Sequence, residues 1–329
     1  MSEIEKIAKQ IIAKGRGILA ADESTGTMTK RLSSVNVEST AENRLKFRET
    51  LFSSEGMKNY IGGVIIYDET IKQKTSSGKT IPELIETSGS VPGIKVDTGA
   101  KKLAGSPEEK ITEGLDGLRE RLAEYYKLGA RFTKWRAVYN ISDKFPSGLS
   151  IKSNAHALAR YAALAQEAKM VPIVEPEVLM DGDHDINKCY EITSKVLKEC
   201  YKELALHKIN LKGTLLKPNM ILPGDKSKNK SNSLEIAKMT IKCLKKNVPS
   251  EVPGIAFLSG GQSSDLATAH LNCMNKNSMD SIPWNLTFSY GRALQVDALE
   301  GWGGENRTSG QENLIKRARS NSLATMGNL

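Results

Sequence analysis

Eight short runs rich in β-branched residues recur along the chain, and amphipathic stretches separate them. Runs of this length and composition are typical of buried strands. The intervening stretches, such as 115–130, 153–169 and 233–248, return an apolar residue every three or four positions, which predicts helices that bury one face. We expect strands at 17–22, 64–69, 93–97, 130–139, 171–179, 213–221, 254–260 and 286–294.

The repeat of strand and helix favours a closed (β/α)8 barrel, known as a TIM barrel, with parallel inner strands and outer helices. The strand onsets recur at about the length of one βα unit, and eight such units suit a closed barrel better than an open sheet. A doubly wound nucleotide-binding fold is the alternative, but no G-x-G-x-x-G follows the first run, and GWGGEN at 301–306 lacks that spacing. With 39% apolar residues among 329, we expect residues 1–329 to form one catalytic barrel domain.

Several functional classes are disfavoured by composition. The N-terminus is polar and acidic, and no eighteen apolar residues run together, so we expect a cytoplasmic chain with no membrane partner. The four cysteines show no C-x-x-C spacing and the four histidines fall at no zinc-ligand interval, which predicts free thiols, no metal and no cofactor.

The net charge of +9 is compatible with a nucleic-acid surface, an anionic substrate or simple solubility. The lysines are interleaved with glutamates along the helical stretches, and aromatic residues make up only 5% of the chain. Few side chains are therefore available for bases to stack on. We expect no nucleic acid as the primary partner.

Charged and polar side chains lie near the C-terminal ends of seven of the eight predicted strands. Barrel enzymes carry catalysis at that end, and alternate residues of a strand share one face. One such residue is usual at a solvated strand end, whereas seven strands sharing the feature indicate one charged mouth. The side chains concerned are Asp22, Lys95 with Asp97, Lys134 with Arg136, Glu175 with Glu177, Lys217, Ser259, and Ser289 with Arg292.

Lys217 is the only charged residue of the apolar stretch GTLLKPNMILPG at 213–224. Such a lysine either ends a strand and reaches water along its stem, or lies in an apolar site that favours the neutral amine, a nucleophile toward carbonyls. Lys134 at the same mouth favours the second interpretation, since a neighbouring cation also opposes protonation. A lysine and a ketone form an iminium, which accepts electrons when the adjacent carbon–carbon bond breaks, and Glu175 and Glu177 fit the proton transfers.

Two groups of small, hydroxyl and basic residues predict phosphate sites. SGG at 259–261 and SYGR at 289–292 follow the last two strands, where barrels often bind phosphate. DESTGTMTKR at 22–31 supplies hydroxyls and cations after the first strand. Taken alone, SGG at 259–261 is typical of an ordinary strand-to-helix turn, and the hydroxyl residues of 22–31 are typical of a helix cap. Their positions at the ends of barrel strands instead favour two phosphate sites, and therefore a bisphosphate substrate.

Eight motifs follow one another in a fixed order: GRGILAADESTGTMTKRL, GIKVDTG, FTKWRAVY, VPIVEPEVL, DGDHDI, GTLLKPNMILPG, FLSGGQS and LTFSYGRALQ. On these motifs the chain closely resembles class I fructose-1,6-bisphosphate aldolase, the Schiff-base family, over nearly its whole length. The resemblance implies a (β/α)8 barrel that reversibly cleaves fructose 1,6-bisphosphate into dihydroxyacetone phosphate and glyceraldehyde 3-phosphate, in glycolysis and gluconeogenesis. It also implies a homotetramer.

The resemblance implies a role for each matching residue. Lys217 would form the Schiff base, Glu175 would act as general acid and base, and Glu177 would support the lysine. Asp22 would hold and deprotonate the substrate hydroxyl, and Lys134 would polarise the site. The substrate-binding residues implied are Ser259, Gly260, Gly261, Ser289, Gly291 and Arg292 for one phosphate, Ser24, Thr27, Arg31 and Lys95 near the other, and Arg136 and Arg44 elsewhere in the site.

Two departures from the family pattern bear on the chemistry. Thr27 stands where family members often have serine, which keeps the hydroxyl. The sequence ends after RARSNSLATMGNL, whereas many family members continue to a terminal tyrosine that helps proton exchange on the enamine. Either the sequence is a shortened form of the protein, or another group or water serves that step.

Two further hypotheses remain open from the sequence. The first is a related Schiff-base aldolase acting on sedoheptulose 1,7-bisphosphate or fructose 1-phosphate. The second is a basic protein whose main role is to bind nucleic acid or acidic filaments, with the barrel as a scaffold.

Overall fold

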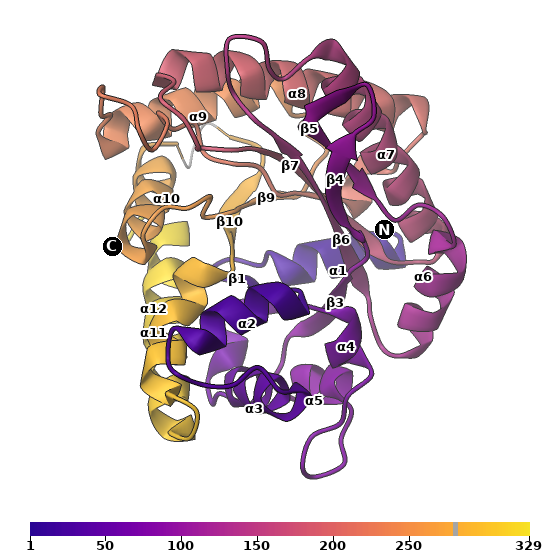
Figure 1. Ribbon diagram of the computed structural model, residues 1–329, viewed down its shortest axis with the longest axis vertical. Coiled ribbons are helices and arrows are strands. Elements are labelled where there is room, and N and C mark those ends of the chain that lie inside the picture. The colour runs from indigo at the N-terminus through magenta and orange to yellow at the C-terminus, as the bar shows by residue number, and fades with distance from the viewer. Residues whose placement is uncertain (279–281) are drawn as a thin grey trace.

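The computed structural model describes residues 1–278 and 282–329, and its centre is a closed barrel of eight parallel strands (Figure 1). Each strand pairs with the next one along the chain, and the first and last close the ring through Ile18 opposite Ser289 and Leu19 opposite Tyr290. The strands are β1 (Gly17–Ala21), β2 (Ile61–Ile66), β3 (Val91–Lys95), β6 (Phe132–Tyr139), β7 (Val171–Val178), β8 (Leu215–Leu216), β9 (Gly254–Phe257) and β10 (Asn285–Tyr290). The predicted (β/α)8 barrel is confirmed.

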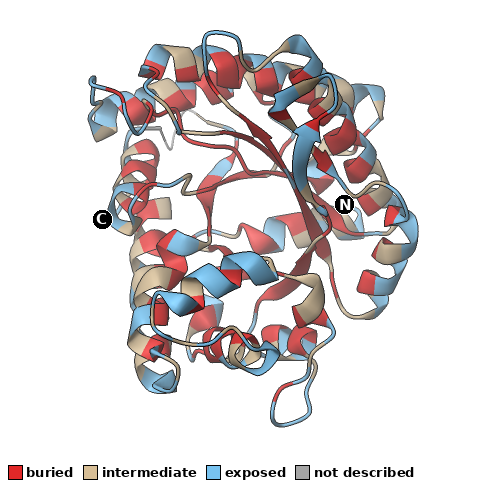
Figure 2. Cartoon of the chain, in the orientation of Figure 1, coloured by how far each residue is buried: buried red, intermediate tan, exposed pale blue. Residues whose placement is uncertain are grey.

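Helices surround the barrel and bury one face against the strands, while their outer faces are exposed (Figure 2). The structure assigns α1 (Glu3–Ile11), α2 (Thr25–Ser33), α3 (Ala41–Phe52), α4 (Asp68–Ile71), α5 (Ile81–Thr87), α6 (Leu118–Lys127), α7 (Gly148–Glu167), α8 (Ile186–Leu206), α9 (Ser233–Asn247), α10 (Ser264–Ser278), α11 (Arg292–Trp302) and α12 (Arg307–Thr325), with short 3₁₀ turns η1 (Met57–Asn59) and η2 (Leu211–Gly213). None of the helices in the described ranges combines the length and apolar character that crossing a bilayer requires.

Several strands differ from the predicted runs. β2 and β3 lie two or three residues earlier than the runs 64–69 and 93–97, so that Asp68 and Glu69 belong to α4, and β9 ends at Phe257 rather than at residue 260. The run 213–221 keeps only the two residues of β8, because Pro218 lacks the N–H that a central strand must donate. The run 286–294 ends at Tyr290, where Gly291 leaves the strand and α11 begins. An antiparallel hairpin of β4 (Gly99–Leu103) and β5 (Ser106–Glu113) follows β3 and was not predicted, since its strands carry mostly polar residues and few of them are buried.

The N-terminal end of the barrel interior is apolar and is closed by α1. Ala8 and Ile11 of α1 and the following Ile12 pack into one buried cluster with inward-facing residues of the strands. The strand residues of this cluster are Ile18, Ala20, Ile65, Val91, Phe132, Val171, Ile173, Leu215 and Ala256. A larger apolar cluster lies between the strands and the surrounding helices. The opposite, C-terminal end of the interior is left open for charged side chains.

Gly62 is required by the contact between β2 and α1, which gives a stability prediction. A Cβ on Gly62 would lie 2.0 Å from the carbonyl oxygen of Ile11, so Gly62→Ala must displace α1 from the end of the barrel. We expect a loss of about 1–3 kcal/mol in the free energy of unfolding, measured by denaturant titration. Gly148→Ala is the matched control, because a Cβ there meets nothing within 4 Å. Equal stability of the two variants would contradict the prediction.

Candidate active site

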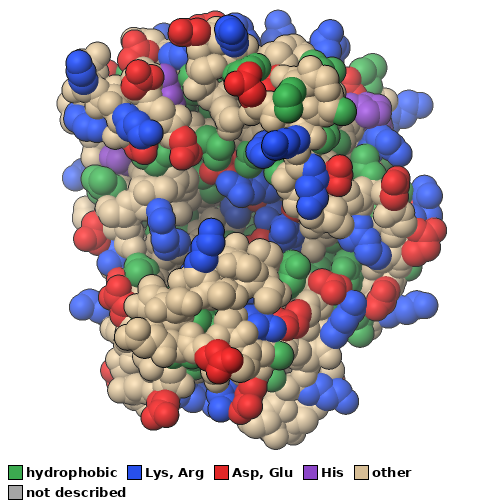
Figure 3. Space-filling model, in the orientation of Figure 1, with side chains coloured by type: hydrophobic (Ala, Val, Ile, Leu, Met, Phe, Trp, Pro, Cys, Tyr) green, Lys and Arg blue, Asp and Glu red, His purple; other side chains and the backbone are tan. Residues whose placement is uncertain are grey.

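A cavity of about 590 Å³ opens at the C-terminal ends of the barrel strands. Figure 3 shows this face hollowed near its centre, with Lys and Arg side chains inside the hollow. The cavity is lined by all of the predicted site residues except Arg44, namely Asp22, Ser24, Thr27, Arg31, Lys95, Lys134, Arg136, Glu175, Glu177, Lys217, Ser259, Gly260, Gly261, Ser289, Gly291 and Arg292. The convergence expected from the strand ends is therefore present.

The alternation of strand residues explains why these side chains meet. On β7, Val171 and Ile173 belong to the apolar cluster inside the barrel, and Glu175 and Glu177 continue the same face into the cavity. Leu215 of β8 and Lys217, which directly follows this strand, are related in the same way. These two strands thus direct apolar side chains to the closed end of the barrel, and charged side chains continue the same face at its open end.

Lys217 follows the last residue of β8 and is held by the strands on both sides. Its backbone N–H donates to the carbonyl of Val174 at 2.8 Å, and the carbonyl of Pro218 accepts from Leu258 at 3.1 Å. The side chain of the next residue, Asn219, accepts a hydrogen bond from the N–H of Val178 at 3.0 Å. The lysine itself is only 4% exposed. Its amine is therefore presented to the cavity from a fixed and mostly dry position.

Glu175 lies between two lysines. Its Oε1 is 3.3 Å from Nζ of Lys217, and its Oε2 is 3.4 Å from Nζ of Lys134. Nζ of Lys134 is also 2.7 Å from Oδ2 of Asp22. All four residues have mostly buried side chains, so the two carboxylates and two amines form one continuous chain of charged groups. Glu175 therefore contacts both lysines, one with each carboxylate oxygen.

Burial and partners act in opposite directions on the pKa values of Asp22 and Lys134. Burial alone would raise the pKa of Asp22, but attraction to Lys134 and then to Lys217 holds it well below its usual range. Burial alone would lower the pKa of Lys134, but Asp22, Glu175 and Asp97 raise it well above its usual range. Asp22 is therefore anionic and Lys134 cationic at neutral pH.

A second set of ion pairs lies beside the first. Nε of Arg136 is 2.5 Å from Oε2 of Glu177, and Nζ of Lys95 is 3.3 Å from Oδ1 of Asp97. Asp97 also accepts hydrogen bonds from the backbone N–H groups of Gly99 at 3.1 Å and Arg136 at 3.3 Å. The cations of this set are thus positioned by carboxylates and face the same cavity.

The groups after β9 and β10 have the features of an anion site. Gly260 and Gly261 take positive φ angles of 56° and 90°, which favour glycine and let the backbone turn close to a ligand. The hydroxyl of Ser289 is buried without a hydrogen-bond partner. α11 begins at Arg292, and its N-cap residue, Gly291, provides no side-chain cap, so this helix N-terminus can donate hydrogen bonds to an anion.

The group after β1 lies at the start of α2, whose N-cap residue is Ser24. The Ser24 hydroxyl makes no capping hydrogen bond to the helix and lies 3.2 Å from the hydroxyl of Thr27. Arg31, on the same helix, forms an ion pair with Glu23 and approaches Gly291 from the other group. The two predicted phosphate-binding groups therefore line one cavity and approach each other at Arg31, as the pairing of β1 with β10 requires.

Arg44 is not brought to the cavity. It lies on α3, and its guanidinium is held by both carboxylate oxygens of Glu69 and by the carbonyl of Ser39. Sequence reasoning missed other lining residues, namely Glu23, Ser34, Gly99 and Ala100. Glu23 directly follows Asp22 in the DEST motif, which was the one available signal. Gly99 and Ala100 come from the unpredicted hairpin.

Comparison with protein families gives one match over almost the whole chain. Residues 3–329 match the family described as "Fructose-bisphosphate aldolase class-I". A "Probable fructose-bisphosphate aldolase class 1" of Xylella fastidiosa is 50% identical over 330 residues, covering 99% of this chain and 98% of that protein. "Fructose-bisphosphate aldolase B" of Gallus gallus is 53% identical, covering 98% of this chain and 90% of that protein.

Two other relatives extend the comparison to a plant protein and to a solved structure. "Fructose-bisphosphate aldolase 4, cytosolic" of Arabidopsis thaliana is 52% identical, over 97% of this chain and 82% of that protein. The solved structure is fructose-bisphosphate aldolase from Plasmodium falciparum in complex with TRAP and a small-molecule inhibitor. It superposes with a TM-score of 0.97 at 45% identity, over 99% of this chain and 94% of that one.

Proposed function

The chain belongs to the class I fructose-bisphosphate aldolase family and is a metal-independent lyase that reversibly cleaves fructose 1,6-bisphosphate, and from this premise we propose which of its residues carry out each step. The observation that carries the assignment is the buried amine of Lys217 at the end of β8, 3.3 Å from a carboxylate oxygen of Glu175. The products are dihydroxyacetone phosphate and glyceraldehyde 3-phosphate.

Schiff-base formation is assigned to Lys217 with Glu175. The neutral amine attacks the C2 carbonyl of the open-chain ketose, and Glu175 is placed to take the proton that the ammonium must lose first. As the carbinolamine dehydrates, the same carboxyl returns a proton to the departing hydroxyl, which leaves as water. The 3.3 Å contact between Lys217 and Glu175 supports this exchange.

Bond cleavage is assigned to Asp22 with Lys134. The C3–C4 electron pair moves into the iminium and leaves an enamine on Lys217, while the C4 hydroxyl gives up its proton as the aldehyde forms. The low pKa of Asp22 keeps it ionised, with Lys134 as its main partner. Because such a carboxylate is a weak base, it takes the proton as the C3–C4 bond breaks, when the hydroxyl becomes acidic. Protonation of the enamine at C3 and hydrolysis then release dihydroxyacetone phosphate.

The supporting residues orient these groups. Glu177 fixes Arg136 at 2.5 Å, which leaves Glu175 as the carboxylate nearest Lys217. Lys134 links Asp22 to Glu175 through contacts of 2.7 and 3.4 Å. The carboxylates and the cations of these pairs attract one another, so the side chains are already ordered before the substrate binds.

The two substrate phosphates are assigned to the two groups of residues that could bind anions. Ser259, Gly260, Gly261, Ser289, Gly291 and Arg292 would bind one phosphate, and Ser24, Thr27, Arg31, Lys95 and Arg136 would bind the other end of the substrate. The unpartnered Ser289 hydroxyl and the open N-terminus of α11 support the first assignment. Arg44 is left out of the substrate site, since it does not line the cavity and its guanidinium is bound by Glu69 and Ser39.

Arg292→Ala tests the first phosphate assignment. Hydrogen bonds from a guanidinium to a charged group are worth about 1.5–3 kcal/mol, so we expect kcat/KM for fructose 1,6-bisphosphate to fall roughly 10- to 100-fold, mostly through KM. Steady-state kinetics measures the effect, and Arg292→Lys should recover part of it. Arg119→Ala, which removes an exposed arginine paired with Glu167, is the control. A KM for Arg292→Ala equal to that of the control would remove Arg292 from the phosphate site.

The substrate preference is tested by kcat/KM for three sugars in parallel. We expect fructose 1,6-bisphosphate to exceed fructose 1-phosphate, because the groups on α2 and β3 would have no second phosphate to bind in the monophosphate. Sedoheptulose 1,7-bisphosphate keeps both phosphates and is the stricter comparison.

Cleavage should be unchanged by EDTA, and loss of activity in EDTA would contradict the Schiff-base mechanism.

We further propose that residues 1–329 act as one catalytic domain, that the chain assembles as a homotetramer and that it works in the cytoplasm. The assembly follows from resemblance to the family, and the Arabidopsis relative described as cytosolic supports the location. Sedimentation equilibrium tests the assembly, where a monomer at micromolar concentration would contradict it.

A further inference from the structure

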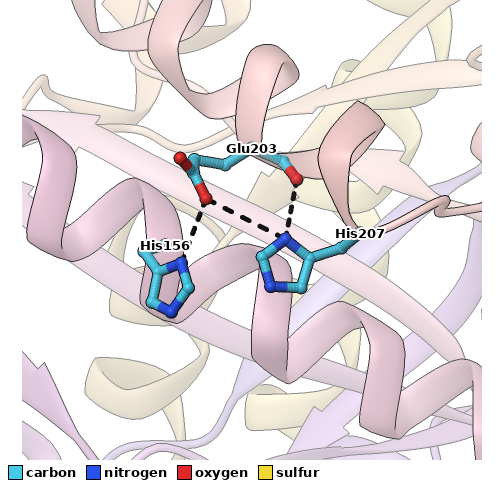
Figure 4. A group of neighbouring side chains, drawn as sticks. All are labelled: His156, Glu203 and His207. Carbon is cyan, nitrogen blue, oxygen red and sulfur yellow. Dashed lines mark hydrogen bonds and ion pairs between the residues drawn. The ribbon is translucent and has the colours of Figure 1, made fainter.

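Three side chains on the outside of the barrel, none of which lines the active-site cavity, converge between two helices. His156 lies on α7, Glu203 lies near the C-terminus of α8, and His207 is the residue that follows this helix. Figure 4 shows the carboxylate of Glu203 placed between the two imidazole rings. Ligand atoms of the three residues all lie within 4.8 Å of one another.

The three residues fall at no zinc-ligand interval along the chain. His156 and Glu203 are 47 positions apart in the chain and come together only because α7 and α8 pack side by side. Glu203 and His207 are four positions apart, which places them on one face of a helix. The helix packing therefore adds a third ligand to an ordinary helical pair.

The distances between the ligand atoms suit a transition-metal ion. Nδ1 of His156 is 3.0 Å from Oε2 of Glu203, and Nδ1 of His207 is 3.9 Å from the same oxygen. Nitrogen and oxygen ligands at zinc bond lengths in a tetrahedral site lie about 3.4 Å apart, and the two observed distances fall on either side of this value. Small side-chain rotations would bring all three atoms into one coordination sphere.

The exposure of the group leaves room for an ion to enter. The side chains of His156, Glu203 and His207 are 53%, 16% and 24% exposed. The two histidines also line an open groove of about 600 Å³ together with residues 115–120 of the segment that leads into α6. Three protein ligands with an open side can be completed by water, as in zinc sites with three protein ligands.

We propose that His156, Glu203 and His207 form a surface site for a divalent transition-metal ion of the zinc type. Two imidazoles and one carboxylate are ligands that zinc accepts and that magnesium and calcium, which prefer oxygen alone, do not favour. The ion would join α7 to α8. His207 now uses Nδ1 to contact the backbone carbonyl of Glu203 at 2.9 Å, so binding exchanges this hydrogen bond for a metal bond and leaves the ring proton on Nε2.

The position of the site separates it from catalysis. α8 returns from the C-terminal end of β7 toward the start of β8, so its last residues lie at the closed end of the barrel, opposite the cavity. None of the three ligands lines the active-site cavity. Binding of zinc should therefore raise the melting temperature without being needed for aldolase activity.

Zinc titration of the full chain tests the proposal. After treatment with a chelator and its removal, isothermal titration calorimetry with zinc chloride should give one site per chain. Loss of a ligand should weaken binding about tenfold or more in His156→Gln, His207→Gln and Glu203→Gln. Glu191→Gln is the matched control, because Glu191 lies on the same helix and pairs with Lys188 and Lys195 instead.

A second readout identifies the ligands directly. Cobalt bound by two imidazoles and a carboxylate should give visible absorption bands that are lost in either histidine variant and kept in Glu191→Gln. The melting temperature of the wild type should rise with zinc, and that of His156→Gln should not. Absence of a site in the wild type, or unchanged affinity in either histidine variant, would overturn the proposal. Aldolase activity should be equal in all four variants, which checks that they are folded.

Discussion

Replacing Lys217 with arginine is expected to lower kcat for fructose 1,6-bisphosphate cleavage by about 10⁴-fold or more, as loss of a covalent nucleophile does in other enzymes. Arginine keeps the positive charge beside Glu175 but cannot become a neutral amine, so no Schiff base forms. The rate is measured by coupled reduction of the triose phosphates. The variant thus separates the charge of Lys217 from its chemistry.

The control for this prediction is Lys212→Arg, an exposed lysine in η2 just before β8. It should keep wild-type activity, and circular dichroism should find both variants folded. Activity of Lys217→Arg within about tenfold of the wild type would mean that another group forms the covalent intermediate, or that none is formed.

The second large effect is expected from Glu175→Gln. Glutamine keeps the size of the side chain but cannot exchange protons between Lys217 and the substrate. Loss of a general acid–base group typically costs about 10²–10⁴-fold in rate, and we expect kcat to fall by that amount with little change in KM. Single-turnover measurements should place the loss in Schiff-base formation.

Glu177→Gln is the matched variant on the same strand. Glu177 contacts Arg136 at 2.5 Å, whereas Glu175 contacts both Lys217 and Lys134. Loss of the Glu177 carboxylate should therefore lower kcat less than loss of the Glu175 carboxylate does. If Glu177→Gln were the more impaired of the two, the roles assigned to these glutamates would have to be exchanged.

The barrel and its charged mouth could be predicted from the sequence because both follow from local pattern. The eight runs give the strands, and the period of two along a strand decides which side chains face inward. VPIVEPEV shows this directly, since Ile173 lies in the apolar cluster and Glu175 and Glu177 continue its face into the cavity. The position of catalytic residues at strand ends then follows from how barrels are built.

What could not be predicted depends on contacts between distant segments. Arg44 matched a family arginine, yet its partner is Glu69, 25 positions away, and nothing in either local sequence indicates the pair. The hairpin of β4 and β5 contributes Gly99 and Ala100 to the cavity, but its exposed strands lack the apolar alternation that predicts a buried strand.

The fine arrangement of charge also required the structure. The sequence placed Lys134 near Lys217 but did not indicate that Glu175 lies between them, with one oxygen toward each amine. The proposed metal ligands are a further case, since His156 joins Glu203 and His207 only through the packing of α7 on α8.

Covalent trapping tests the central assignment most directly. The chain is incubated with dihydroxyacetone phosphate, reduced with borohydride and mapped by mass spectrometry of its peptides. We expect one adduct per chain, on Lys217, absent from Lys217→Arg and formed equally in EDTA. An adduct on Lys95 or Lys134, or no adduct at all, would contradict the account.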